Sequence, residues 1–349
     1  MRCSSLILLL ASTLVSATVS SAQQSRRWVV PRTADGRPDL QGNWSNATVT
    51  PLERPQGLGP VLTGEQVAIA EGRLKARIDS LSRKSDPNRA APPKGGVSLG
   101  DPRFDAASGG TGGYNVFYID PGERVALVNG EARSSLITRP ANGRVPALTP
   151  AAQARATAVR NQYGNFLNPE NRPLAERCII SFGSNGGPPM LPNYFYNNNY
   201  TIVQTRDHVM ILTEMVHDAR IIRLGSGPRL PKHVQPYFGD SFGRWAGDTL
   251  VIETTGFHPA QAAGFYGASP EMKVTERIVR IGERTLLYQF TVEDSSSFAE
   301  PWGGELPFNR LDEQVYEYAC HEANYSLSNV LSGARDEERR KSGTPPEDQ

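Results

Sequence analysis

One candidate for acid–base chemistry in this sequence is a carboxylate on the apolar face of a predicted strand. The run 208–216 has the pattern of a strand, and the residues predicted to share a face with Glu214 are apolar. An unpaired carboxylate is costly to bury, and burial raises its pKa, so Glu214 is a candidate general acid or base. The alternative is a structural ion pair with Arg220 or Arg223, which lie on the next predicted strand.

A second candidate lies beside the last cysteine. The run 314–320 has the pattern of a strand, with Tyr318 and Cys320 on one face and His321 continuing the other. A disulfide at Cys320 would hold His321 rigidly, as a catalytic base requires. The alternative is a histidine whose ring is satisfied by hydrogen bonds in the core.

Glu214 and His217 together form an E-x-x-H pair. That spacing brings two side chains to one face of a helix but sends them to opposite faces of a strand, unless the chain turns at His217. We therefore predict no metal and keep His217 as a candidate catalytic residue. The sequence also lacks the Walker A, Rossmann, EF-hand and H-E-x-x-H motifs, so no cofactor is predicted.

Aromatic and amide side chains are the candidate ligand-binding residues. Rings and amides together suit an aromatic or carbohydrate-linked molecule, and Arg220 or Asn199 would stabilise charge that develops on it. The alternative is that these residues are ordinary core and turn residues. The candidates are Tyr196, Asn199, Tyr200, Trp302 and Tyr318.

The first 22 residues have the pattern of a secretory signal peptide. Arg2 precedes an apolar run, and small residues up to Ala22 suit cleavage there; the alternative is an uncleaved anchor. Cleavage removes Cys3 and leaves Cys178 and Cys320 in an oxidising compartment, so we predict that they form a disulfide. Two buried free thiols are the alternative.

Two helices are predicted to pack outside the strands. Thr63 and Gln66 have the spacing of a capping box ahead of apolar residues at helical spacing. Thr149 and Pro150 open a second helix that runs to about Tyr163.

Short alternating segments separated by tight turns dominate the rest of the chain. They predict a mainly β fold, an antiparallel meander that closes into a calycin-like barrel or forms a sandwich. The predicted strands are 116–119, 124–128, 134–138, 200–205, 208–216, 219–224, 243–245, 249–255, 274–281, 285–292 and 314–320. We expect an extended segment over 23–113 with a Gly- and Pro-rich loop, a β-rich core domain over 114–334 and a disordered charged tail over 335–349.

The charge of the chain bears on its partners. The formal net charge is +1 at pH 7, which argues against nucleic acid or an anionic membrane surface as the partner. No stretch after the signal approaches the length of a membrane span. The expected partner is a small molecule, and the sequence does not indicate an oligomeric state.

Several strings resemble a large family of exported bacterial proteins. The resemblance covers most of the mature chain and implies export and one continuous architecture, but it assigns no catalytic residue. The strings are 38–48 (PDLQGNWSNAT), 50–55 (TPLERP), 198–200 (NNY), 214–222 (EMVHDARII), 243–250 (GRWAGDTL) and 316–325 (YEYACHEANY).

Two functions remain open from the sequence. The first is an exported, metal-independent hydrolase or lyase that acts on an aromatic or carbohydrate-linked substrate in a barrel cavity. In that hypothesis Glu214 and His321 serve as acid and base. The second is a non-catalytic periplasmic binding protein for a hydrophobic small molecule.

Overall fold

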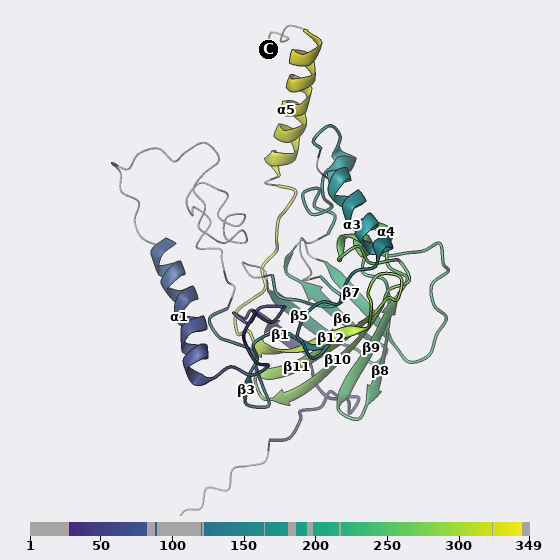
Figure 1. The fold of residues 1–349 in the computed structure, drawn as a ribbon. Helices are drawn as coiled ribbons and strands as arrows, with labels where there is room; N and C mark the ends of the chain where they lie inside the picture. Colours follow the sequence, from purple (N-terminus) through teal and green to yellow (C-terminus); the bar gives the residue numbers. More distant parts are fainter. Residues whose placement is uncertain are drawn as a thin grey trace, which may run out of the picture.

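The computed structural model describes residues 28–81, 88, 120, 122–163, 165–180, 186–193, 198–215, 218–322 and 324–343. They form a mainly β fold built around a closed barrel (Figure 1). The barrel strands are β1 (Gly42–Ser45), β5 (Asn199–Gln204), β6 (His208–Thr213), β7 (Ala219–Leu224), β8 (Asp240–Ala246), β9 (Thr249–Thr255), β10 (Lys273–Gly282), β11 (Thr285–Glu293) and β12 (Trp302–Arg310). The sequence-based prediction of a barrel is confirmed.

Pairing between the first and last strands closes the barrel. Trp44 of β1 lies opposite Arg310 of β12 and also opposite Tyr200 of β5, so β1 joins the two ends of the meander. An extra strand, β4 (Ile137–Arg139), pairs with the other end of β12. Strand β1 belongs to the 23–113 segment, which therefore contributes a strand to the barrel.

The prediction of antiparallel pairing is wrong at one position. Strands β7 and β8 are parallel, with Arg223 opposite Phe242 and Leu224 opposite Gly243. The connection over residues 225–239 is long enough to carry the chain back along the barrel, as a parallel pair of strands requires.

Strand β12 is not evident from the sequence pattern. Gly303, Gly304 and Pro307 all lower strand propensity. The structure explains the first two: a Cβ at Gly303 would lie 2.2 Å from the carbonyl oxygen of Phe290, and one at Gly304 would lie 2.0 Å from that of Leu136. Both positions need glycine because β11 and the segment before β4 approach so closely.

Alternate residues of the strands point inward and pack together. The inward-facing large side chains are fully or almost fully buried, which makes the strand-enclosed region a packed core. They include Trp44, Tyr200, Ile202, Ile211, Ile222, Leu250, Ile252, Ile278, Leu286, Tyr288, Leu306 and Phe308.

Both predicted helices are present. Helix α1 (Gly64–Leu81) begins with the expected capping box: the Thr63 amide donates to Gln66 Oε1 (2.9 Å), and the Gln66 amide donates to Thr63 Oγ1 (3.3 Å). Helix α3 (Pro150–Tyr163) begins with Pro150, and the Thr149 hydroxyl accepts from the Ala152 amide (3.2 Å). Helix α3 and the short α4 (Pro259–Gly264) lie at one end of the barrel (Figure 1).

The C-terminal predictions were wrong in two places. Residues 314–320 are not a strand, and residues 325–342 form helix α5 (Tyr325–Ser342) where a disordered tail was expected from 335 onward. The charges that suggested disorder are spaced for a helix instead: Asp336 pairs with Arg340 (2.7 Å) and Glu337 with Lys341 (2.7 Å). Gly343, in the left-handed conformation, ends the helix.

The remaining elements are small. A hairpin is formed by β2 (Leu127–Val128) and β3 (Glu131–Ala132), and Pro169–Asn171 is a 3₁₀ turn. Within the part of the chain that the structure describes, no helix has the length and apolar character needed to cross a membrane. The predicted signal peptide, residues 1–22, lies outside the described residues.

Candidate functional site

A buried ion pair crosses the interior of the barrel. Arg220 on β7 makes two hydrogen bonds to the carboxylate of Glu276 on β10 (2.7 and 2.9 Å). Since β8 and β9 separate these strands in the sheet, the two side chains meet through the core. Glu276 is 0% exposed and Arg220 3%. Arg220 is therefore paired with Glu276 rather than with Glu214. The prediction that Arg220 stabilises charge on a substrate is corrected to a structural role in the core.

The ion pair belongs to a larger polar network. The hydroxyl of Tyr288 donates to Glu276 (2.8 Å) and accepts from the amide of Met190 (2.9 Å). Burial raises the pKa of the Tyr288 phenol, and the charge of Glu276 raises it further. Asn46 donates to the carbonyl of Met190 (3.3 Å) and to the hydroxyl of Tyr200 (3.2 Å). The core thus holds both backbone polar groups of Met190.

Tyr200, predicted to bind ligand, is instead a core residue. Its side chain is 0% exposed, and its ring packs against Phe308 with centroids 5.2 Å apart. Burial raises the pKa of its phenol, although the hydrogen bond from Asn46 acts in the opposite direction. A neutral, enclosed ring of this kind stabilises the barrel and does not contact solvent or ligand.

A pocket of about 430 Å³ lies at the end of the barrel near α3 and α4. Phe257 follows β9 and Met272 precedes β10, so both lie at this end of the strands. Another part of the lining comes from residues 187–189, just before Met190, whose amide is held by the core network. The apolar lining includes Leu174, Ile180, Pro188, Pro189, Phe257 and Met272.

Three polar side chains line the same pocket. They are Tyr163 at the end of α3, Gln261 in α4, and Tyr266. Burial raises the pKa of both tyrosine phenols, so they stay protonated hydrogen-bonding groups over the physiological range. The pocket therefore combines apolar walls with a few polar groups, the usual composition of a small-molecule site.

Trp302 packs against two of the aromatic residues that line this pocket. Its side chain is fully buried, and Phe265 stacks on it with centroids 5.8 Å apart, while Tyr266 meets its edge at 6.1 Å. Phe265 and Tyr266 line the pocket, and Trp302 does not. The prediction that Trp302 contributes to ligand binding is therefore corrected to an indirect role, through the two rings that pack on it.

A buried carboxylate fixes the segment that carries these rings. Asp294 accepts hydrogen bonds from the amide of Ser269 (2.7 Å) and from the hydroxyls of Ser269 and Ser296. Burial acts to raise the pKa of Asp294, but these hydrogen bonds outweigh it and hold the pKa below its usual value. The ionised carboxylate thereby anchors residue 269, three positions after Tyr266.

The predicted catalytic residues are only partly brought together. Asn199 donates from its amide to Glu214 Oε2 (2.9 Å). Met215, the next residue, packs with Cys178, Tyr318 and Cys320. The segments that carry Glu214 and the last cysteine are thus neighbours.

The structure does not place the remaining candidate residues that it describes beside Glu214. His321 is exposed, and the half-buried Tyr318 has its phenol pKa raised by burial. His217 and Tyr196 lie outside the described residues. Among the described residues, no three His, Cys, Asp or Glu side chains are grouped so as to hold a metal ion.

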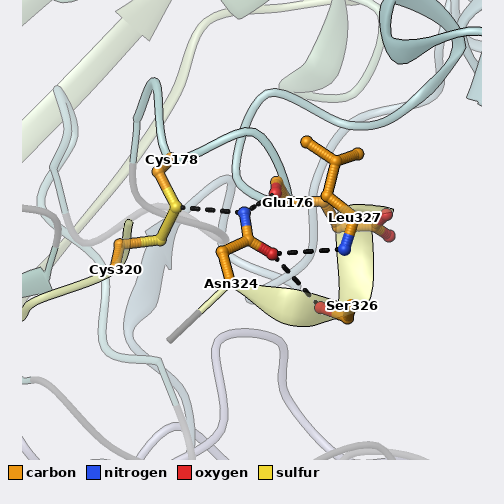
Figure 2. The surroundings of a disulfide bond; sticks show 6 residues. All are labelled: Glu176, Cys178, Cys320, Asn324, Ser326 and Leu327. Atoms are coloured by element: carbon orange, nitrogen blue, oxygen red, sulfur yellow. Dashed lines mark hydrogen bonds between the residues drawn. A yellow bond between two sulfur atoms is a disulfide. The ribbon is translucent and has the colours of Figure 1, made fainter. Parts of the chain in front are cut away.

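The predicted disulfide is confirmed. Cys178 and Cys320 are bonded, with their Cα atoms 5.8 Å apart (Figure 2). Asn324 lies against this bond: its amide donates to the carbonyl of Glu176 (2.7 Å) and contacts Cys178 Sγ (3.4 Å), while its oxygen caps α5 by accepting from the Leu327 amide. The disulfide region therefore fixes the start of α5.

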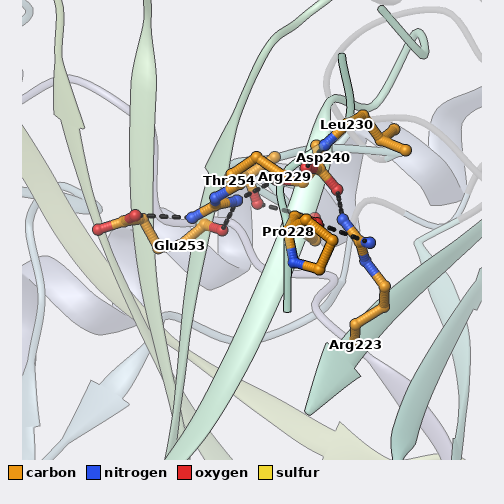
Figure 3. Close-up of polar contacts among 8 residues, drawn as sticks. Arg223, Pro228, Arg229, Leu230, Asp240, Glu253 and Thr254 are labelled. Carbon is orange, nitrogen blue, oxygen red and sulfur yellow. Dashed lines mark hydrogen bonds and ion pairs between the residues drawn. The ribbon is translucent and has the colours of Figure 1, made fainter. Parts of the chain in front are cut away.

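Arg223, the other predicted partner of Glu214, pairs instead within a cluster of charged side chains near β8 and β9. Arg223 pairs with Asp240, and Arg229 pairs with Glu253 (2.7 Å) (Figure 3). Both guanidinium groups lie over the ring of Phe242, 4.1 and 4.5 Å from its centroid. This arrangement holds the 225–239 connection against β8 and β9, a structural role.

Sequence reasoning missed the pocket residues. Gln261, Phe265 and Tyr266 lie in one short segment at α4, but Tyr163 is about a hundred residues earlier, and no spacing in the sequence relates it to them. The adjacent rings of Phe265 and Tyr266 after a glycine were the one visible signal. Comparison of the chain with protein-family models, curated proteins and solved structures gave no match.

Proposed function

We propose that this protein binds a small, largely apolar molecule with a hydrogen-bonding group in the pocket near α3 and α4. The observation that carries the proposal is the lining: apolar and aromatic side chains surround about 430 Å³, with Tyr163, Gln261 and Tyr266 as the polar groups. That volume lies within the range of ligand sites, about 300–1,000 Å³.

The anchoring of the pocket supports this proposal. The Met190 segment is held by the core network and the segment after Tyr266 by Asp294, so two parts of the lining are held by the protein's own hydrogen bonds. A preformed site loses little conformational entropy on binding, which favours affinity for a small ligand.

We further propose that the protein is exported, with a signal peptide cleaved after about Ala22, and acts in the periplasm or outside the cell. The disulfide between Cys178 and Cys320 supports this location, because disulfides persist in oxidising compartments. The near-neutral charge supports a small-molecule partner over nucleic acid.

Filling the pocket is expected to abolish probe binding. Ala260 lines the pocket from α4, so Ala260→Trp should occupy its volume. We expect the neutral probe N-phenyl-1-naphthylamine to bind the mature wild type saturably, with a rise in fluorescence, and Ala260→Trp to weaken binding at least about tenfold. Fluorescence titration measures this effect.

The matched control is Ala246→Trp, which adds the same ring at an exposed position at the end of β8. It should bind the probe as the wild type does. Equal affinity in Ala260→Trp and the wild type, with both proteins folded by circular dichroism, would refute the pocket as the binding site.

A second proposal, a metal-independent hydrolase or lyase, is favoured by the hydrogen bond between Asn199 and Glu214. In this proposal Glu214 acts as the general acid or base, with His321 as its partner. Contact of Met215 with the disulfide cluster supports the proximity of the two segments.

The enzyme proposal predicts a loss of turnover. On a panel of aromatic esters and glycosides, Glu214→Gln should lower kcat at least about 100-fold, as removal of a general acid or base does. His321→Ala should act similarly, and Glu322→Gln, exposed beside it, should not. Turnover that is unchanged in both variants, or absent in the wild type, would leave the binding proposal alone.

A further inference from the structure

We propose a second binding site, for an oxyanion, on the outer face of the barrel where β4, β12, β11 and β10 lie side by side. A hollow of about 320 Å³ lies there. Unlike the pocket near α4, it is lined by cationic and hydroxyl side chains. They are Thr138 and Arg139 of β4, Thr275 and Arg277 of β10, and Thr291 of β11; the amide of Gln289 on β11 lies among them.

The strand register builds this hollow. Thr275 lies opposite Thr291, Thr291 opposite Gly303, and Gly303 opposite Arg139. Because Gly303 has no side chain, the guanidinium of Arg139 reaches over β12 to the Thr291 hydroxyl (3.4 Å). Gly303 is required because the Phe290 backbone approaches it closely. Its lack of a side chain also leaves space in the hollow.

Arg277 borders the same hollow from β10, opposite Gln289. Its side chain is exposed. In the described part of the chain, neither Arg277 nor Arg139 forms an ion pair. The two guanidinium groups therefore lie on one surface with their charge uncompensated.

The neighbouring carboxylates pair with cations other than Arg139 and Arg277. Glu305, the one carboxylate among the described residues that line the hollow, pairs with Arg133 (2.8 Å) and accepts from Gln289 (3.1 Å); Arg133 also pairs with the exposed Glu131 (2.7 Å). Beyond it, Glu293 pairs with Lys273 (2.6 Å), and Glu253 with Arg229 (2.7 Å). In the described part of the chain, two arginines and one carboxylate line the hollow, and that carboxylate is paired with Arg133, so the lining is positively charged although the whole chain is near neutral.

This chemistry selects an oxyanion. Guanidinium groups bind carboxylate and phosphate through paired, charge-assisted hydrogen bonds, and the threonine hydroxyls add donors between them. The shared chemistry of the ligand is a carboxylate or phosphate group on a small polar molecule. An apolar molecule or a cation would leave both arginines without a partner.

The test uses isothermal titration of the mature protein at low ionic strength with inorganic phosphate, tartrate and the neutral polyol erythritol. We expect saturable binding of phosphate or tartrate, and none of erythritol. Which of the two anions binds more tightly distinguishes a phosphate from a carboxylate ligand. Arg139→Gln and Arg277→Gln should each weaken binding about tenfold, the loss of one charge-assisted interaction.

Arg244→Gln is the matched control, because Arg244 is an exposed barrel arginine on β8, away from the hollow. It should leave anion affinity unchanged. Probe binding in the apolar pocket should persist in the Arg139→Gln/Arg277→Gln double variant, so the two proposals fail independently. Equal anion affinity in the double variant, or no saturable anion binding by the wild type at millimolar concentration, would overturn the proposal.

Discussion

Replacement of Glu276 by alanine is expected to destabilise the protein by about 3–5 kcal/mol, because it leaves Arg220 charged and unpaired inside the barrel. The substitution also removes the acceptor of the Tyr288 hydroxyl, the group that holds the Met190 amide. Equilibrium unfolding in urea, followed by intrinsic fluorescence, measures the loss as a lower midpoint at a similar slope.

Glu253→Ala is the control for this experiment. It breaks the Arg229–Glu253 ion pair, whose side chains are 37% and 50% exposed. Solvent-exposed pairs contribute little, so the expected loss is below about 1 kcal/mol. Equal losses in Glu276→Ala and Glu253→Ala would contradict the assignment of the Arg220–Glu276 pair to the core.

A double variant separates the penalty of an unpaired charge from the value of the pair. Arg220→Met combined with Glu276→Leu removes both charges and keeps apolar volume in the barrel. Buried ion pairs replaced in this way often lose little or no stability. We therefore expect the double variant to be more stable than Glu276→Ala, and the reverse order would argue against a buried charge as the cause.

Removal of the disulfide is expected to cost about 2–5 kcal/mol. The bond joins residues separated by 142 positions, so it constrains a long loop in the unfolded chain. In the folded state it joins the segment after α3 to the segment before α5, beside Met215. Cys178→Ser with Cys320→Ser should therefore lower the urea midpoint, and hydrogen exchange should quicken first in α5.

Reduction of the wild type provides an independent check. A reductant that opens the bond should shift the wild-type midpoint to that of the double serine variant, and it should leave the variant unchanged. Identical midpoints for the oxidised wild type and the variant would show that the bond contributes no stability. Faster exchange in β9 and β10 than in α5 would contradict the local role given to the bond.

The core network links stability to the proposed ligand site. Tyr288 connects the buried ion pair to the Met190 amide, Asn46 bonds to the Met190 carbonyl, and residues just before Met190 line the pocket. Trp302 similarly supports Phe265 and Tyr266 from inside the barrel. The residues that line the pocket are therefore held in place by core residues that do not line it.

The sequence alone determined the features that depend on near neighbours. Alternation of apolar residues predicted strands β5 to β7 and β9 to β11, because side chains alternate across a strand. The capping box at Thr63 and the proline at position 150 predicted the starts of α1 and α3. Counting cysteines after removal of the signal peptide predicted the bond between Cys178 and Cys320.

Only the tertiary structure decided which distant groups meet. Glu276 lies 56 residues from Arg220, so no local pattern could choose it over Glu214 as the partner. The sequence pattern did not predict strand β12, because two of its positions are glycines. Those glycines are required by the close approach of the Phe290 and Leu136 backbones, which the sequence does not place nearby. The apolar pocket and the two-arginine hollow depend on strand order and register, and these are set by packing of the whole barrel.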